Sequence, residues 1–312
     1  PLKYCIITPN LFCSGHSSSP SNTDHPQDGP RFPSVTYYDN INAQDKLISE
    51  YFGITNPLMY IGFSMGAQQA FHWGALHADK TGGIIPLCGT AKTTTQNWIT
   101  LEGCKLALQS DVNYNNGDYI SPPKKGLKAF SRNYTSTLFD KEGYEEGLHL
   151  NLFDGFEDTE SYLDYMDAFF GSIDANDLLG MLNTWQMGDI GKHQKFNNNT
   201  KEALANINCP ALVMPSSTDL SFPARNNIPE VKAMPNAELR VINTKYGHLA
   251  GGMSTALTSQ EDVIFIDLIR LGSASFISKV NPDSCLIISP LCGTLPAIAT
   301  TKPPNVSTSS LL

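Results

Sequence analysis

The segment Gly62-Phe63-Ser64-Met65-Gly66 constrains the fold of this 312-residue chain more than any other, because it has the form G-x-S-x-G. Residues 58–61 are an apolar run typical of a buried strand, and residues 67–73 have the small and apolar side chains of a packed helix. A strand that passes directly into a helix needs a strained backbone at the serine and glycines two positions either side. The pattern predicts that Ser64 is an exposed nucleophile, with a purely structural turn as the alternative.

Apolar runs on both sides of this turn predict an α/β protein with a mostly parallel sheet. Strand signals at 3–8, 58–63 and 83–88 alternate with helical patterns, and further strand signals follow at 211–215 and 238–243. The first helix is expected over 41–51, with Asp39 or Asn40 as its N-cap and Gly53 beyond its end.

The middle and the end of the chain have a different character. From 94 to 206 only helical patterns remain, at 98–109, 126–139, 162–170 and 175–187, which predicts a helical cap inserted into a core of 1–93 and 207–271. A last helix is expected over 260–270. Residues 272–312 are rich in Ser, Thr and Pro, which predicts a disordered or poorly packed tail.

Charge and residue spacing exclude several classes of function. A net charge of −9 argues against nucleic-acid binding. No apolar segment is long enough to cross a membrane, and seven scattered cysteines without C-x-x-C predict reduced thiols in the cytoplasm. The histidines lack metal-binding spacing, since His72 and His77 fall on different helix faces, so neither metal nor cofactor is expected. A homodimer is left open.

A serine nucleophile needs a base, and the base needs an orienting acid, each beyond the end of a later strand. Asp219 lies five residues after Met214, and His248 follows the strand signal at 238–242. We expect Ser64 Oγ, His248 and Asp219 to be linked at roughly 2.6–3.2 Å. The alternatives are a helix cap for Asp219 and a surface position for His248, and Asp262 is a weaker candidate for the acid.

Further motifs make the chain resemble the homoserine O-acetyltransferase-like branch of the α/β-hydrolase superfamily, from about Lys3 to Arg270. The resemblance implies a triad of Ser64, Asp219 and His248, acyl-enzyme chemistry and no cofactor. The motifs are Thr8-Pro9-Asn10, Gly29-Pro30-Arg31-Phe32-Pro33, Asp39-Asn40, Gly62 to Ala70, Asn116-Gly117-Asp118-Tyr119, Asp174-Ala175-Asn176, Thr218-Asp219-Leu220-Ser221-Phe222-Pro223 and Pro235-Asn236-Ala237-Glu238.

The chain departs from that branch in two places. Acetyltransferases of the branch follow the catalytic histidine with an aspartate that helps to bind the amino-acid acceptor, whereas Leu249 stands here. In addition, the fold places a second oxyanion donor in the loop after its third strand. That strand should precede residues 3–8, so we expect an N-terminally truncated chain that lacks the first strands and keeps only the Met65 N–H as a donor.

Three functions follow as hypotheses. The first is a serine hydrolase that acts on a small ester or thioester through an acyl-enzyme. The second is an O-acyltransferase that moves an acyl group from acyl-CoA, as co-substrate, to a small hydroxyl acceptor. Leu249 favours the hydrolase, or an acceptor other than homoserine. The third is a catalytically impaired fragment.

Overall fold

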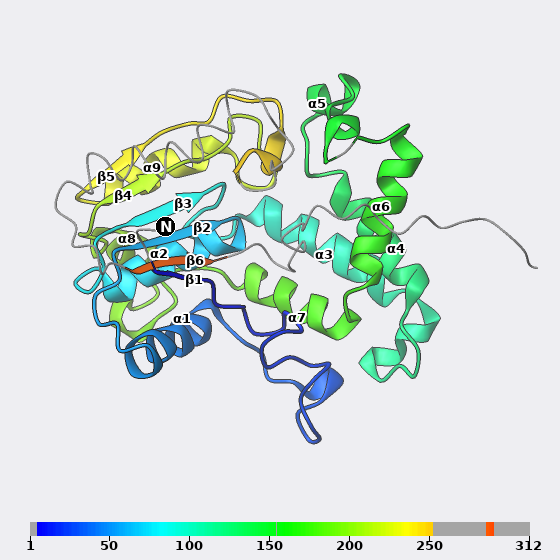
Figure 1. Cartoon of the computed structure of the whole chain (residues 1–312), viewed down its shortest axis with the longest axis horizontal. Coiled ribbons are helices and arrows are strands. Elements are labelled where there is room, and N and C mark those ends of the chain that lie inside the picture. The colour runs from blue at the N-terminus through cyan, green and yellow to red at the C-terminus, as the bar shows by residue number, and fades with distance from the viewer. Residues whose placement is uncertain (1–4, 154, 252–284, 290–312) are drawn as a thin grey trace, which may run out of the picture.

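The computed structural model describes residues 5–153, 155–251 and 285–289, and its parallel sheet lies on the left in Figure 1. In this part of the chain the sheet has six strands in the order β1-β6-β2-β3-β4-β5, and every neighbouring pair is parallel. The strands are β1 (Cys5–Ile7), β2 (Met59–Phe63), β3 (Ile84–Leu87), β4 (Ala211–Val213), β5 (Ala237–Leu239) and β6 (Cys285–Ser289).

The described helices fall into two groups. The sheet carries α1 (Tyr37–Lys46), α2 (Met65–His77), α8 (Thr200–Ala205) and α9 (Asn227–Ala233). The cap contains α3 (Thr95–Gln109), α4 (Lys124–Thr135), α5 (Lys141–Glu145), α6 (Thr159–Gly171) and α7 (Ala175–Gln186). Short 3-10 segments are Gly29–Arg31, Val112–Gly117, Leu148–Asn151, Gln194–Phe196, Ala224–Asn226 and Gly247–Gly251, and Leu47–Tyr51 is a π-helical turn.

Strand β2 and helix α2 form the buried centre of the sheet domain. All five residues of β2 are buried, as expected for a central parallel strand that is covered on both faces. Helix α2 is buried from Met65 to Ala75, and its small residues allow this close packing. A Cβ atom at Gly74 would lie 3.0 Å from Ile84 and 3.2 Å from Ile207, so α2 sits close against the sheet.

Helix α1 begins earlier than the sequence predicted. Its N-cap is Thr36, whose hydroxyl accepts from the Asp39 N–H while the Asp39 carboxylate accepts from the Thr36 N–H. Asp39 is therefore the third residue of a capping box and not the cap itself. Buried polar pairs then fix α1 against α2, because Gln44 Nε2 donates to Gln69 Oε1 at 2.6 Å.

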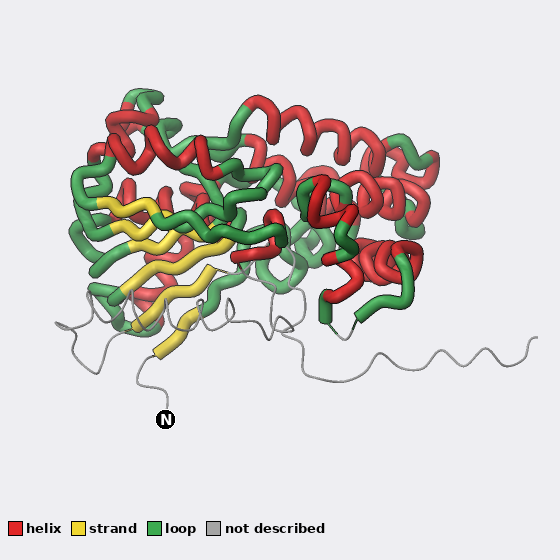
Figure 2. Tube along the Cα trace, turned by 90° about the horizontal axis from the view of Figure 1, so that it is seen from above, coloured by secondary structure: helices red, strands yellow, loops and turns green. Residues whose placement is uncertain are grey.

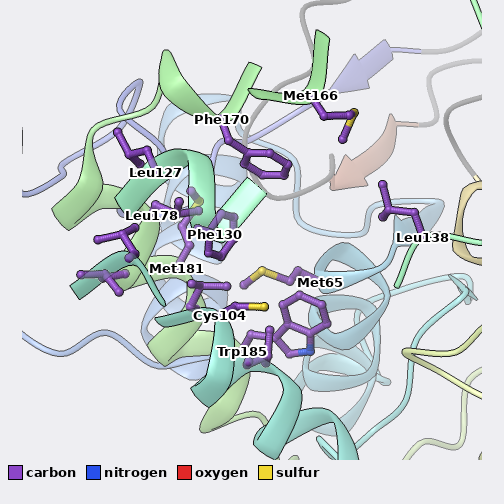
Figure 3. Packing of buried hydrophobic residues seen from close by; sticks show 14 of the residues in the cluster. Met65, Cys104, Leu127, Phe130, Leu138, Met166, Phe170, Leu178, Met181 and Trp185 are labelled. Carbon is purple, nitrogen blue, oxygen red and sulfur yellow. The ribbon is translucent and has the colours of Figure 1, made fainter. Parts of the chain in front are cut away.

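The cap helices lie beyond one end of the strands (Figure 2) and share one hydrophobic cluster with the Ser64 turn. Figure 3 shows this cluster, in which Met65 from the start of α2 packs among side chains of the cap. The labelled cap residues include Cys104 on α3, Phe130 on α4, Phe170 on α6 and Trp185 on α7. The cap therefore packs directly on the turn that carries Ser64.

The two ends of the cap meet in a short stem. Lys92 and Asp189 form an antiparallel bridge, and Lys92 Nζ lies 2.8 Å from Asp189 Oδ2. Beyond this stem, Ala203 and Leu204 of α8 pack with the hydrophobic cluster of the sheet. We therefore place the end of the cap before Asp189, which corrects the predicted boundary at residue 206.

Strand β6 is the largest difference from the expected fold. It lies within residues 272–312, for which the sequence predicted a disordered or poorly packed tail, and that prediction is wrong for this segment. Strand β6 pairs on one side with β1 and on the other with β2, and Ile287 is fully buried. The predicted helix over 260–270, including Asp262, falls outside the described residues.

Candidate active site

Ser64 lies at the turn between β2 and α2, in the conformation that the sequence predicted. Its backbone has φ 57° and ψ −120°, a strained combination for a residue with a side chain. Gly62 is required because a Cβ atom there would lie 1.9 Å from the carbonyl oxygen of Gly66. From the other side, a Cβ at Gly89 would lie 2.4 Å from the Ala67 Cβ, so the loop after β3 presses against the turn.

The three residues predicted to form a triad come together in this structure. His248 Nε2 lies 2.8 Å from Ser64 Oγ, and His248 Nδ1 lies 2.7 Å from Asp219 Oδ2. The carboxylate can only accept, so Nδ1 carries the proton and Nε2 is free to accept from the hydroxyl. All three side chains are buried, and the distances agree with the predicted range.

Asp219 is held by the loop that follows β4. Its Oδ1 atom accepts from the backbone N–H of Ser221 at 2.8 Å and of Phe222 at 2.9 Å. These bonds occupy one carboxylate oxygen and leave the other for His248. The loop thereby fixes the direction of the carboxylate before any substrate binds.

The histidine loop is tied both to the aspartate loop and to the cap. The Thr218 hydroxyl donates to the Thr244 carbonyl at 2.9 Å and accepts from the Gly247 N–H at 3.1 Å. The His248 N–H donates to the Leu138 carbonyl of the cap at 2.8 Å. Gly247 has φ +56° and lies so close to the cap that a Cβ would be 2.4 Å from the same carbonyl oxygen.

Aromatic rings contact the imidazole of His248, a feature that the sequence analysis missed. Phe63 stacks on it with ring centroids 5.0 Å apart, and Phe222 stacks on it at 5.5 Å. Phe63 lies within the motif Gly62 to Ala70, and Phe222 lies within the motif Thr218 to Pro223. Their positions, directly before Ser64 and three residues after Asp219, were the available signal.

An apolar cavity of about 40 Å³ opens beside His248, between the triad and the cap. Leu249, which is only 2% exposed, lines it together with the aromatic and aliphatic residues of α4, α6 and α7. The lining residues are Phe130, Tyr134, Leu138, Leu152, Phe153, Tyr162, Met166, Phe169, Phe170, Ile173, Leu178, Leu182, Trp185, His248 and Leu249.

The backbone N–H of Met65 is the candidate oxyanion donor. Met65 is the first residue of α2, where an N–H has no acceptor within the helix, and the positive end of the helix dipole favours an anion. On the other side of β2, Ser289 is in register with Gly62. The residues that follow Ser289 lie outside the described ones. The expectation that the chain lacks a second oxyanion donor therefore remains a prediction.

A second buried histidine, His72 on α2, lies outside the triad. Burial lowers the pKa of His72 to about 4, and its Nδ1 donates to the Gln68 carbonyl at 2.6 Å, so this histidine is a neutral part of the core. Within the described ranges no cluster of three His, Cys, Asp or Glu side chains is placed to hold a metal ion. In the same ranges, none of the helices is both long and apolar enough to cross a bilayer.

Comparison with known proteins gives the class to which this fold and this triad belong. The family model of the alpha/beta hydrolase fold matches residues 1–251, and the chain therefore belongs to the α/β-hydrolase fold family. An ethyl acetate hydrolase from Pseudomonas veronii is 33% identical over 273 residues, which cover 86% of this chain and 77% of that protein. A solved acetylester hydrolase from Corynebacterium glutamicum is 33% identical with a TM-score of 0.74, over 81% of this chain and 72% of that one.

The comparisons also bear on the branch within this family. A homoserine O-acetyltransferase from Chlorobaculum parvum is 26% identical over 266 residues, which cover 83% of this chain and 74% of that protein. The chain is thus similar both to ester hydrolases and to homoserine O-acetyltransferases, as expected from the resemblance drawn from the motifs.

Proposed function

We propose that this protein hydrolyses small carboxylic esters through an acyl-enzyme on Ser64, with His248 as general base and Asp219 as the acid that orients it. The observation that carries the proposal is the continuous hydrogen-bonded chain from Ser64 Oγ to His248 at 2.8 Å and from His248 to Asp219 at 2.7 Å. Such a chain activates a serine hydroxyl, which is a weak nucleophile alone.

In the acylation step, Ser64 Oγ attacks the ester carbonyl carbon while His248 Nε2 takes the hydroxyl proton. The carbonyl oxygen gains negative charge and is stabilised by the Met65 N–H at the start of α2. When the tetrahedral intermediate collapses, the bond to the alcohol oxygen breaks and the imidazolium returns its proton to that oxygen. Asp219 stays ionised and stabilises the imidazolium.

In the deacylation step, water takes the place of the alcohol. His248 removes one proton from the water as its oxygen attacks the acyl carbon, and collapse of the second intermediate breaks the bond to Ser64 Oγ. The proton passes back to Ser64, so the carboxylic acid leaves and the free enzyme is restored. No cofactor takes part in this sequence.

The cavity supports a short, uncharged substrate. A space of about 40 Å³ holds only a few water molecules, so it suits a short acyl or alkyl group better than a long chain. Its lining is almost entirely hydrocarbon, and a charged group would lose its hydration there without gaining a partner. Relatives named for ethyl acetate and acetyl ester hydrolysis support short esters as the substrate class.

Acyl transfer to an amino-acid acceptor is the less supported function. An ammonium group next to the triad would need a carboxylate, and Leu249 presents a buried aliphatic side chain there. Hydrolysis needs only a water molecule as acceptor, and water requires no carboxylate at the position of Leu249.

The proposal is tested with Ser64→Ala, using p-nitrophenyl acetate turnover and labelling by a fluorophosphonate probe. The variant should lose labelling completely and lose kcat by about a millionfold, because the attacking oxygen is gone. Ser172→Ala, an exposed serine after α6, is the matched control and should retain both. Equal labelling of Ser64→Ala and the wild type would refute a nucleophilic Ser64.

A cytoplasmic location and a homodimer are further proposals. Free thiols at Cys5, Cys13, Cys88, Cys104 and Cys209 support a reducing compartment. Sedimentation equilibrium at several protein concentrations would test the homodimer.

A further inference from the structure

Four rings from four separate segments form a stack through the imidazole of the triad. Phe63 ends β2, His248 and Phe222 belong to the loops after β5 and β4, and Trp185 lies on the cap helix α7. Phe63 and Phe222 each stack on His248 with planes 30° apart, and Trp185 stacks on Phe222 at 5.5 Å and 13°. The mechanism above uses only the imidazole of this stack.

Phe63 and Phe222 both stack on the imidazole, and each comes from a different segment of the chain. Their centroids are 5.0 and 5.5 Å from that of His248, and each ring plane is 30° from that of the imidazole. Among the aromatic contacts of the described residues, no ring contact joins Phe63 to Phe222. The buried imidazole is therefore packed against two separate phenyl rings, and these contacts restrict its rotation about the side-chain bonds.

Phe222 also acts on the acid of the triad, through a different part of the same residue. Its backbone N–H donates to Asp219 Oδ1 at 2.9 Å. Its side chain stacks on the imidazole of His248, whose Nδ1 donates to the other carboxylate oxygen, Oδ2, at 2.7 Å. A substitution of the side chain leaves the backbone N–H in place. The contribution of the ring can thus be separated from that of the carboxylate anchor.

We propose that Phe222 is a positioning residue for the base, which together with Phe63 packs against the imidazole so that Nε2 stays directed at Ser64 Oγ. Contact with the two rings favours catalysis in two ways. It restricts the imidazole to the orientation that satisfies both hydrogen bonds. The electron-rich faces of the two phenyl rings also favour the imidazolium that forms in each tetrahedral step. This inference rests on the proposed function of the triad.

Trp185 extends the stack to the substrate cavity. It is 1% exposed, lines the cavity, and stacks on Phe222. Phe222 is fully buried and contacts both Trp185 and His248, so its ring is held in place by two neighbours. The cap therefore supports the position of the base as well as forming the wall of the substrate cavity.

The test is Phe222→Leu, which removes the ring and keeps an apolar side chain. We expect kcat for p-nitrophenyl acetate to fall roughly 10- to 100-fold while KM changes little, because the ring orients the base and does not line the cavity. The rate of fluorophosphonate labelling should fall in parallel. The NMR signal of the proton between His248 Nδ1 and Asp219 should broaden, since the imidazole becomes more mobile.

Phe196→Leu is the matched control, because Phe196 is 2% exposed and packs with the sheet cluster away from the triad. It should lower stability without changing kcat, KM or the proton signal. Wild-type kcat in folded Phe222→Leu would overturn the proposal, as would equal loss of kcat in both variants. If Phe222→Leu does not fold, Phe63→Leu decides, because it removes the other ring that stacks on His248 and should give the same loss of kcat.

The outcomes also separate this inference from the proposed function. Suppose that the wild type and Phe222→Leu are equally active and that Ser64→Ala is inactive. This result would overturn only the role of the Phe222 ring. Equal activity of the wild type and Ser64→Ala would instead overturn the proposed function itself.

Discussion

At the residue scale, the triad is fixed by groups that surround each of its members. Gly62 and Gly89 allow the Ser64 turn to close, two backbone N–H groups hold Asp219, and the His248 N–H is bound to the cap. The geometry that a serine nucleophile needs is thus present in the free protein. Catalysis by such a site depends on orientation that exists before the substrate arrives.

The orienting role of the acid gives a prediction for Asp219→Asn. The asparagine oxygen should keep the two backbone N–H bonds, which turns its NH₂ group towards His248 Nδ1. That group can only donate, so the imidazole adopts the wrong tautomer and Nε2 can no longer accept from Ser64. We expect kcat for p-nitrophenyl acetate to fall about 10⁴-fold at nearly unchanged stability.

Steady-state kinetics together with urea denaturation would check this prediction. Asp164→Asn is the control, because Asp164 is an exposed carboxylate on α6 that pairs with Arg132. It should leave kcat unchanged. Wild-type kcat in Asp219→Asn would mean that another acid orients His248.

At the element scale, helix α9 braces the loop that presses on the Ser64 turn. Glu230 Oε1 accepts from the Ala91 N–H at 2.9 Å, and Asn227 Nδ2 donates both to Glu230 Oε2 at 2.8 Å and to the Gly89 carbonyl at 2.9 Å. Burial raises the pKa of Glu230 from 4.5 to about 8. The carboxyl group therefore keeps its proton in the folded state at a pH where the unfolded chain has lost it.

This raised pKa predicts a pH-dependent stability. Below the unfolded pKa of 4.5 the group is protonated in both states and has no effect, and between 4.5 and 8 the free energy of unfolding should fall as the pH rises. Glu230→Gln has no such titration. Its stability relative to the wild type should therefore rise steadily from pH 5 to pH 8 and then level off.

Urea denaturation at several pH values measures this difference. Glu145→Gln, an exposed residue of α5, is the control and should differ from the wild type by the same amount at every pH. A constant difference for Glu230→Gln as well would show that Glu230 ionises normally in the folded protein.

At the scale of the whole molecule, local patterns predicted most elements but not all of their long-range pairings. The apolar runs around Ser64 predicted β2 and α2, and the strand-end positions of Asp219 and His248 predicted their meeting with Ser64. The stem between Lys92 and Asp189 was missed because α8 beyond it has the same helical pattern as the cap. The capping role of Thr36 was missed because Asp39, its partner in the capping box, is itself a good cap residue.

Strand β6 was missed for a related reason. Its neighbours β1 and β2 lie more than 200 positions earlier in the sequence, and no local pattern records such a pairing. A short apolar run surrounded by Ser, Thr and Pro resembles a tail in composition. Its place inside the sheet, between β1 and β2, is visible only in three dimensions.

The position of β6 between β1 and β2 predicts a large effect of Ile287→Ala. Ile287 is fully buried and in register with both Ile7 and Tyr60, so truncation leaves a cavity in the hydrophobic cluster that covers one face of the sheet. We expect the free energy of unfolding to fall by about 2–5 kcal/mol in urea denaturation. Ile120→Ala, at an exposed position, should change it by less than about 0.5 kcal/mol. Equal stability of the two variants would place β6 outside the sheet.

The most direct test of the central claim is to observe the acyl-enzyme itself. The protein is mixed briefly with p-nitrophenyl acetate, quenched in acid, and analysed by intact mass spectrometry and peptide mapping. We predict an added mass of one acetyl group, located on the peptide that contains Ser64 and absent from Ser64→Ala. Ester turnover with no acetyl group on Ser64, or an acetyl group that accumulates on another residue at the rate of turnover, would contradict the account.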